Sequence, residues 1–301
     1  MTHENKMVLV VGATGMLGTE VVSQLRRDDC EVTEAIWPPL NDVKQQLCLD
    51  ITDAEAVRHV FDWVRPGVVF NCSAFTDVDG AEEKENLATA VNARGVGHLA
   101  ELCHERDILL VHVSTDYVFD GRGKHPYKPT DPTAPQGAYG RSKLAGEQAI
   151  RYYLGPSGAY AMVRTSWLFG PAGKNFIDTI LRLAREKPSL KVVNDQVGCP
   201  TFAPDLARCL IDLAHKQVTG LYHFCNPPAC TWYDFARRAV ELAELDCHID
   251  PCTTGEFPRP APRPAYSVMD CTDTFDKLGW SARPWQEALA EYIRGLKQPV
   301  T

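Results

Sequence analysis

Residues 7–18 read MVLVVGATGMLG, an apolar run followed directly by three glycines spaced three residues apart. MVLVV at 7–11 has the composition of a buried strand, and a helix is predicted to begin near Met16. Glycines at such a turn let the backbone approach a pyrophosphate, whose charge the helix N-terminus stabilises. G-x-x-G-x-x-G is less common than G-x-G-x-x-G, and any tight strand-to-helix turn can contain it. Its place after the first strand favours dinucleotide binding. The predicted residues are Gly12, Thr14, Gly15, Met16, Leu17 and Gly18.

Strand-like and helical patterns alternate downstream of this turn. A strand is predicted within Glu31–Trp37, and Thr52 with Glu55 forms a predicted capping box for a helix that ends at Pro66-Gly67. Further strands are expected at 68–74, 108–114 and 159–167, with helices at 86–104 and 139–153. This alternation predicts an α/β fold, a Rossmann-type doubly wound parallel sheet.

The second half of the chain is less regular. Helical patterns occur near 175–186, 203–216, 231–244 and 284–297, and β-like segments at 191–195 and 220–224. We predict a dinucleotide-binding domain at 1–165 and a smaller C-terminal substrate-binding lobe at 166–301. Part of the second half, about 200–224, is expected to return to the sheet. The loop at 122–137 is long, and such loops are often functional.

Composition argues against nucleic-acid-binding, membrane and disulfide-rich secreted proteins. The 301 residues are 45% hydrophobic and 23% charged, with a formal net charge of −8, which argues against general binding to nucleic acid or a membrane surface. MTHENK at 1–6 lacks the apolar run of a signal peptide, and no apolar stretch approaches the roughly 20 residues of a membrane span. Eleven scattered cysteines, an odd number, favour a reducing cytoplasm over a disulfide framework.

One group of cysteines and histidines invites a zinc interpretation. Its members are His223, Cys225, Cys230, Cys247, His248 and Cys252. Zinc sites usually contain tighter pairs such as C-x2-C, whereas both cysteine pairs here are spaced C-x4-C. Unconnected thiols are therefore favoured over a zinc site.

The cofactor preference stays open at this stage. An acid that binds the ribose of NAD normally lies at the end of the second strand, but AIWPPL at 35–40 contains neither that acid nor an arginine for NADP. Asp50 and Ile51 lie where a loop can contact the adenine. Ala74, Phe75 and Thr76 end a predicted strand that faces the cofactor. Both segments are equally compatible with ordinary loop packing.

Tyr139 and Lys143 lie four residues apart at the start of a predicted helix, so they share one face. A nearby ammonium is expected to lower the tyrosine pKa from near 10, allowing Tyr139 to protonate a carbonyl oxygen as hydride arrives at its carbon. Lys143 can also bind the nicotinamide ribose. The preceding strand ends in Ser114-Thr115, where a hydroxyl can bind the substrate oxygen. The alternative is an exposed Tyr/Lys pair on an amphipathic helix.

Nine motifs together suggest a family. They are GATGMLG (12–18), VVFNCSAFTDVDGAE (68–82), VNARG (91–95), STDYVFDG (114–121), YGRSKLAGE (139–147), RTSWLFG (164–170), NFIDTIL (175–181), NDQVGCPT (194–201) and RPAYS (263–267). The chain resembles the extended short-chain dehydrogenase/reductase family and, within it, the members that reduce the C4 ketone of dTDP-4-dehydro-L-rhamnose.

The resemblance implies a catalytic triad of Thr115, Tyr139 and Lys143, with NADPH or NADH supplying hydride to C4 of a nucleotide-linked 4-keto sugar. Thr115, Asp116 and Trp167 would contact the sugar, although Trp167 could also be core filler. The residues that would line the cofactor are Gly15, Met16, Leu17, Asp50, Ile51, Ala74, Phe75 and Thr76.

Related members form homodimers through Mg2+ held by glutamates, and Glu20 matches one such position. Pro204 stands where another acid would be expected, with Asp205 beside it, so the metal is doubtful. Glu20 could instead be a favourable acid near a helix N-terminus. Two other functions stay open: another nucleotide-sugar reductase or epimerase, and a non-catalytic regulatory subunit like that of methionine adenosyltransferase.

Overall fold

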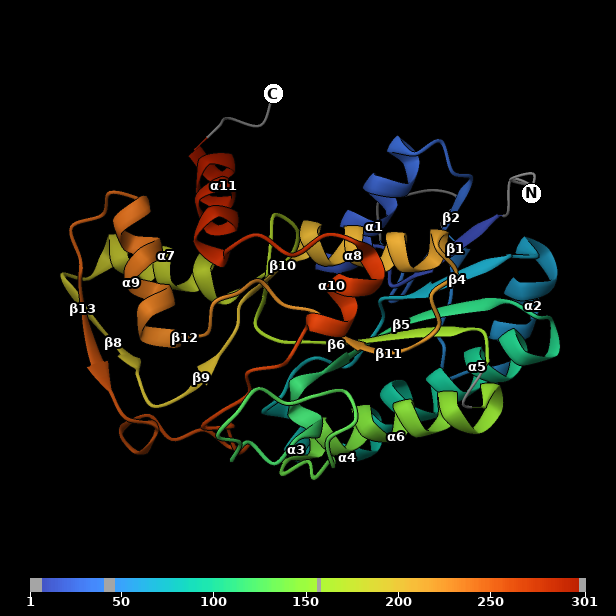
Figure 1. The fold of residues 1–301 in the computed structure, drawn as a ribbon, viewed down its shortest axis with the longest axis horizontal. Helices are drawn as coiled ribbons and strands as arrows, with labels where there is room; N and C mark the ends of the chain where they lie inside the picture. The colour runs from blue at the N-terminus through green and yellow to red at the C-terminus, as the bar shows by residue number, and fades with distance from the viewer. Residues whose placement is uncertain (1–6, 41–46, 156–157, 298–301) are drawn as a thin grey trace.

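The computed structural model describes residues 7–40, 47–155 and 158–297. Its centre is a seven-stranded sheet in the order β11-β6-β5-β4-β1-β2-β3, in which every neighbouring pair is parallel (Figure 1). The strands are β1 (Val8–Val11), β2 (Val32–Ile36), β3 (Leu47–Cys48), β4 (Val68–Asn71), β5 (Leu109–Thr115), β6 (Tyr160–Thr165) and β11 (Gly220–His223). The predicted Rossmann-type sheet is confirmed. The strand order reverses between β1 and β4, the position at which such sheets bind ligands.

Helices cover both faces of the sheet, as the alternation predicts. One face carries α1 (Met16–Arg27) and α8 (Ala203–His215), and the other carries α2 (Ala54–Val64), α5 (Val96–Glu105) and α6 (Ala138–Leu154) (Figure 1). Successive strand residues point to opposite faces, so Val10 packs beneath α1 whereas Leu9 packs beneath α2 and α5. The sheet is therefore buried on both sides, and site residues gather at its carboxyl edge.

One local prediction in this half was wrong, and another was confirmed with a change in helix type. The N-cap of α2 is Asp53, which accepts hydrogen bonds from the Glu55 and Ala56 amides, because Asp50 already binds both the amide and the hydroxyl of Thr52. The helix expected at 86–104 is confirmed, and it contains a π-helical turn. It consists of α4 (Glu85–Thr89), the π-helical turn η1 (Ala90–Gly95) and α5. Such turns often mark functional positions.

The second half forms a lobe beside the sheet, at the left of Figure 1. Its helices are α7 (Phe176–Glu186), α9 (Trp232–Leu242) and α11 (Trp285–Lys297). The lobe also contains three two-stranded sheets. They pair β7 (Leu168–Phe169) with β10 (Thr201–Phe202), β9 (Val197–Gly198) with β12 (Cys230–Thr231), and β8 (Ser189–Val193) with β13 (His248–Cys252). The chain enters this lobe directly from the carboxyl end of β6, which places the lobe at the site edge of the sheet.

Besides α8, two segments of the second half return to the sheet. β11 pairs with β6 along Gly220–His223, and α10 (Thr272–Leu278) packs against β11 and α8. The sequence patterns had indicated β11 but neither α10 nor β13.

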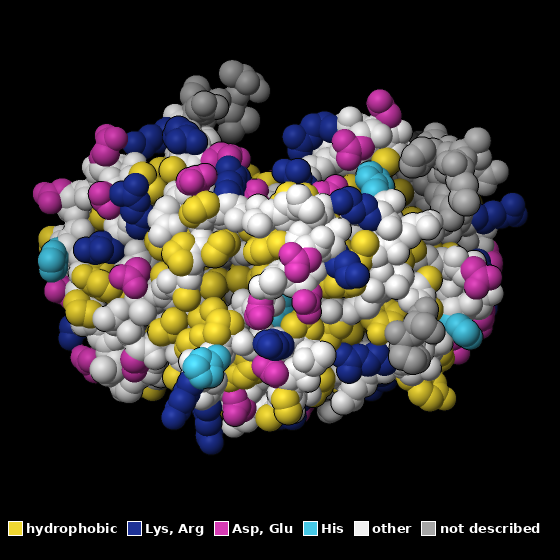
Figure 2. All heavy atoms as spheres, in the orientation of Figure 1, with side chains coloured by type: hydrophobic (Ala, Val, Ile, Leu, Met, Phe, Trp, Pro, Cys, Tyr) yellow, Lys and Arg dark blue, Asp and Glu magenta, His cyan; other side chains and the backbone are white. Residues whose placement is uncertain are grey.

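No helix in the described ranges is long and apolar enough to cross a membrane. Acidic and basic side chains are interspersed over the face shown in Figure 2. All eleven cysteines are free thiols, and the suspected zinc group is spread over separate apolar clusters around Cys225, Cys230 and Cys247. The polar start at 1–6 lies outside the described residues.

Candidate active site

The three glycines after β1 have different structural roles. Gly12 has a φ of +76°, and a Cβ there would lie 2.7 Å from the Ser73 amide nitrogen. A Cβ on Gly18 would lie 2.1 Å from the Gly12 carbonyl oxygen, so the helix can approach the turn only with glycine here. Gly15 is the N-cap of α1 and has no side-chain cap. The turn thus presents uncapped helix amides to an anion.

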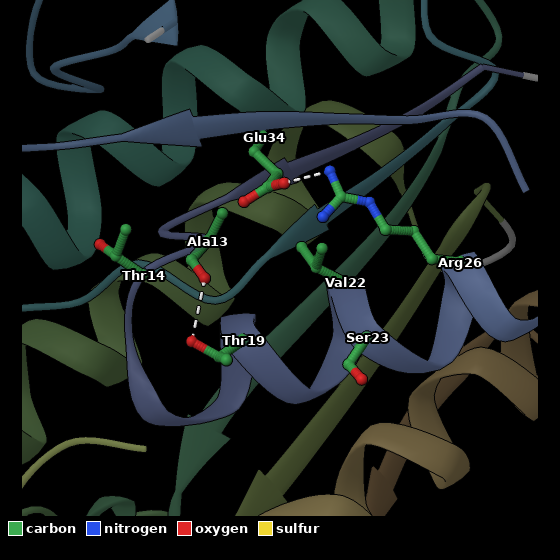
Figure 3. Close-up of a pocket in the computed structure, with 7 residues that line it drawn as sticks. All are labelled: Ala13, Thr14, Thr19, Val22, Ser23, Arg26 and Glu34. Atoms are coloured by element: carbon green, nitrogen blue, oxygen red, sulfur yellow. Dashed lines mark hydrogen bonds and ion pairs between the residues drawn. The ribbon is translucent and has the colours of Figure 1, made fainter. Parts of the chain in front are cut away.

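A cavity of about 480 Å³ extends from this turn between α1 and β2 (Figure 3). Its lining residues are Ala13, Thr14, Thr19, Val22, Ser23, Arg26 and Glu34. Arg26 forms an ion pair with Glu34 across the cavity. An acid or an arginine was expected only at the end of the second strand. Both are present nearby, the acid within β2 and the arginine on α1.

The two predicted cofactor loops follow β3 and β4. Ile51 is buried, its carbonyl lies 3.0 Å from Nδ1 of His98, and its side chain occupies the space beside Gly95. Phe75 is held by Asn92 through both backbone groups: its amide donates to Asn92 Oδ1 at 2.9 Å, and its carbonyl accepts from Asn92 Nδ2 at 3.0 Å. Asn92 also donates to Ser142 on α6, so it links the loop after β4 to α6.

Tyr139 is the second residue of α6, and the start of this helix is fixed from outside. Glu82 accepts a 2.8 Å hydrogen bond from the Ala138 amide, which caps the helix N-terminus. The Tyr139 ring meets Tyr117 edge-on at 5.6 Å between ring centroids and packs beside Phe75. The phenol therefore lies between the cofactor loop after β4 and the segment after β5.

Thr115 ends β5 beside this phenol. Its hydroxyl donates to Asp116 Oδ1 at 3.0 Å and accepts from the Tyr117 amide at 3.2 Å. Burial raises the pKa of Tyr139 to about 12, while a hydrogen bond with Thr115 lowers it and the Asp116 charge raises it. Tyr139 and Thr115 are thus brought together as the sequence analysis expected.

The expected effect of Lys143 on the Tyr139 pKa was wrong for this arrangement. Lys143 Nζ donates to the Val113 carbonyl at 2.6 Å and lies 3.5 Å from Nε2 of His112. Burial lowers the pKa of Lys143 to about 8, although the charge of Glu147 raises it. Desolvation therefore outweighs helical spacing in setting both pKa values.

Asp116 is buried and incompletely partnered. Its Oδ2 atom has no hydrogen-bond partner within the described ranges. Burial raises the pKa of Asp116 to about 6, although Ser267 and Thr115 lower it. A buried carboxylate oxygen without a partner is uncommon, and the Ser267 hydroxyl that lowers the Asp116 pKa likewise has no partner within the described ranges.

Trp167 packs against an apolar cluster of the lobe in a constrained backbone conformation. Its φ is +47°, its indole stacks on Trp232 at 3.7 Å between centroids, and a Cβ on Gly198 would lie 2.7 Å from its ring. A left-handed backbone at a bulky residue is unfavourable and is typical of binding sites. Trp232 was missed because it lies in α9, sixty-five residues downstream along the sequence.

Buried polar side chains form a layer between α6 and the sheet. Glu147 on α6 binds Arg164 through two hydrogen bonds of 2.8 and 2.7 Å, and Ser114 donates to Glu147 at 2.6 Å. Lys143 and His112 belong to the same layer. The sequence analysis missed Glu147, Arg164 and His112, although all three lie in or beside its motifs.

The predicted magnesium ligand Glu20 lies on α1, facing Glu291 of α11. Burial and the Glu291 charge raise the pKa of Glu20, against Arg27, which lowers it. Arg283 binds Asp205 through two contacts of 3.0 Å and Glu291 at 2.5 Å. No group of three metal-binding side chains occurs in the described part of the chain. Asp205 and Glu291 are therefore already paired with the Arg283 guanidinium.

A sequence model described as RmlD substrate binding domain matches residues 6–298. The chain belongs to this family. A dTDP-4-dehydrorhamnose reductase of Mycobacterium tuberculosis H37Rv is 40% identical, covering 96% of this chain and 93% of that protein. A dTDP-4-keto-6-deoxy-D-glucose reductase of Streptomyces niveus is 39% identical, covering 94% and 95%. The structure of Bacillus anthracis dTDP-4-dehydrorhamnose reductase in complex with NADP has a TM-score of 0.89 at 33% identity, covering 97% and 99%. The RmlD relationship therefore extends over both the sheet and the lobe.

Proposed function

We propose that this chain catalyses the NAD(P)H-dependent reduction of the C4 ketone of dTDP-4-dehydro-L-rhamnose, giving dTDP-L-rhamnose. The observation that carries the proposal is the position of the Tyr139 phenol. It lies beside Thr115 at the carboxyl end of β5, next to the loop held by Asn92. Relatives that share about 40% of the sequence bear the name of this reductase.

The cofactor would occupy the glycine turn and the loops after β3 and β4, and it supplies hydride to C4. Tyr139 then protonates the ketone oxygen. Because burial keeps its pKa near 12, Tyr139 holds its proton at neutral pH until an alkoxide develops on the substrate. Thr115 orients the same oxygen, and Lys143 binds the nicotinamide ribose. The sheet domain, residues 1–165, binds the cofactor in this proposal, and the lobe within 166–301 covers the sugar.

Asp116 and Trp167 would hold the sugar. The unpartnered Oδ2 atom of Asp116 can accept a sugar hydroxyl, and the constrained Trp167 indole offers an apolar wall. Because Arg283 already binds Asp205 and Glu291, we propose neither a magnesium bridge at these acids nor a dimer that depends on one. Eleven free thiols support a cytoplasmic location.

The direct test is NAD(P)H oxidation, followed by absorbance, with dTDP-4-dehydro-L-rhamnose as substrate. Tyr139→Phe removes the proton donor, so kcat should fall by roughly 10²–10⁴-fold while cofactor affinity is retained. Tyr152→Phe on the same helix is the matched control, because that ring is 82% exposed. Turnover unaffected by Tyr139→Phe would refute the catalytic role.

A second substrate is supported by one finding, the 39% identity to a dTDP-4-keto-6-deoxy-D-glucose reductase. Comparing kcat/KM for the two keto sugars decides between them. A cofactor-binding protein inert toward every 4-keto sugar would instead favour the regulatory-subunit interpretation.

A further inference from the structure

The polar layer under α6 contains a chain of hydrogen bonds that ends at Lys143. Asn71 and His112 are direct neighbours in the register of β4 and β5, so their side chains lie on the same face of the sheet. Both are almost completely buried, at 1% and 0% exposure. Lys143 reaches them from α6, where it is 3% exposed.

The direction of each bond follows from groups that can act in only one way. The Ser73 backbone N–H can only donate, and it donates to Asn71 Oδ1 at 3.1 Å; the Ser73 hydroxyl donates to the same oxygen at 2.6 Å. The Asn71 amide nitrogen must therefore face Nδ1 of His112, 3.1 Å away. An amide nitrogen only donates, so Nδ1 is the acceptor and the ring proton of His112 resides on Nε2.

This tautomer directs an N–H toward Lys143. His112 Nε2 lies 3.5 Å from Lys143 Nζ, which itself donates to the Val113 carbonyl at 2.6 Å. An ammonium has only donors, whereas a free amine has a lone pair that can accept from this N–H. The His112 N–H thus favours the uncharged amine, whereas the Val113 carbonyl accepts a hydrogen bond from either form.

The other titratable groups around Lys143 do not reverse this effect. Burial raises the pKa of the Cys72 thiol to about 12, so Cys72 stays neutral. Glu147, one turn along α6, is bound by Arg164, which offsets its charge. His112 is neutral as well, because burial and Lys143 hold its pKa well below its usual range.

We propose that Asn71 and His112 are positioning residues for Lys143: Asn71 selects the Nε2–H tautomer of His112, and that N–H holds the Lys143 amine and favours its uncharged form. This inference rests on the proposed function, in which Lys143 lies one helical turn from Tyr139. A lysine whose pKa lies close to ambient pH can both accept and return a proton. Reprotonation of Tyr139 after each turnover requires such a group.

Asn71→Asp tests the tautomer directly. One carboxylate oxygen can still accept from Ser73, but the other can only accept from the ring, so the proton of His112 should move to Nδ1. The Nε2 lone pair would then face Lys143 and favour its ammonium form. Nitrogen-15 shifts of the His112 ring in the full-length protein report the tautomer without reference to activity. If the wild-type ring carries its proton on Nδ1, the proposal is wrong, even when the variant does not fold.

The functional consequence is a shift in the pH profile of kcat at saturating cofactor and sugar. The alkaline limb, set by Lys143 losing its proton, should move upward by about one pH unit in Asn71→Asp, a tenfold gain in proton affinity. His112→Phe removes the imidazole, and Asn71→Asp in that background is the matched control for charge alone. An equal shift there would show that the introduced carboxylate acts through space and would overturn the role of His112.

The inference and the proposed function fail in different ways. An alkaline limb of kcat that persists unchanged in Lys143→Met would reject the catalytic assignment of Lys143. The nitrogen-15 result on His112 would still decide whether Asn71 selects the tautomer.

Discussion

Glu147→Gln should destabilise the protein far more than any substitution on its surface. Glu147 and Arg164 are 0% and 1% exposed, and their carboxylate and guanidinium share two hydrogen bonds, with Ser114 adding a third to the carboxylate. Neutralising the carboxylate leaves a buried guanidinium, whose remaining contacts are the Pro129 carbonyl at 3.3 Å and the Phe119 ring at 5.0 Å. Removing one partner of such a pair costs about 3–5 kcal/mol.

The expected change in melting temperature follows from the chain length. With an unfolding entropy of about 2.1 cal/mol/K per residue over 301 residues, this loss lowers Tm by about 5–8 °C, measured by circular dichroism. Glu186→Gln is the control, because its pair with Arg182 is exposed and contributes about 0.5 kcal/mol or less.

The reasoning also predicts how a double variant behaves. Replacing both charges in Glu147→Leu/Arg164→Met leaves no unpaired ion, so it should cost clearly less than Glu147→Gln alone. Equal melting temperatures for Glu147→Gln and Glu186→Gln would refute the burial of an uncompensated charge as the cause. A double variant less stable than the single one would do the same.

Three further substitutions test the site. Asp116→Asn should stabilise the protein at pH 7 by up to about 3 kcal/mol, because the raised pKa of Asp116 makes the folded protein lose stability as pH rises from 3.8 to about 6. In urea unfolding, the gain in midpoint should vanish near pH 4. Gly18→Ala should weaken cofactor binding at least tenfold in calorimetry, because its Cβ would lie 2.1 Å from a carbonyl oxygen, whereas Gly97→Ala, with its nearest neighbour at 3.7 Å, should not. Trp232→Leu should raise KM for the sugar by up to about tenfold with cofactor affinity unchanged, as the loss of an aromatic pair predicts, and Trp63→Leu, 70% exposed, should change neither.

Local sequence was sufficient wherever the determining interaction is local. The turn at 12–18 needs glycine because of contacts within one strand-to-helix connection, and alternating apolar runs specify strands that are buried on both faces. The same logic placed Tyr139 at the start of a helix and Thr115 at the end of a strand. It failed at Thr52, where a competing bond to Asp50 moved the N-cap by one residue.

Tertiary structure decided what depends on distant segments. The register of β4 and β5 brings Asn71 to His112, forty-one residues apart, and the crossing of α6 over the sheet brings Glu147 to Arg164. Burial, which no local pattern measures, raised the Tyr139 pKa, opposite to the lowering expected from Lys143. It also lowered the pKa of Lys143. Sequence specified which side chains reach the carboxyl edge of the sheet, whereas folding set their partners, because hydrogen bonds and desolvation depend on the distances that only packing creates.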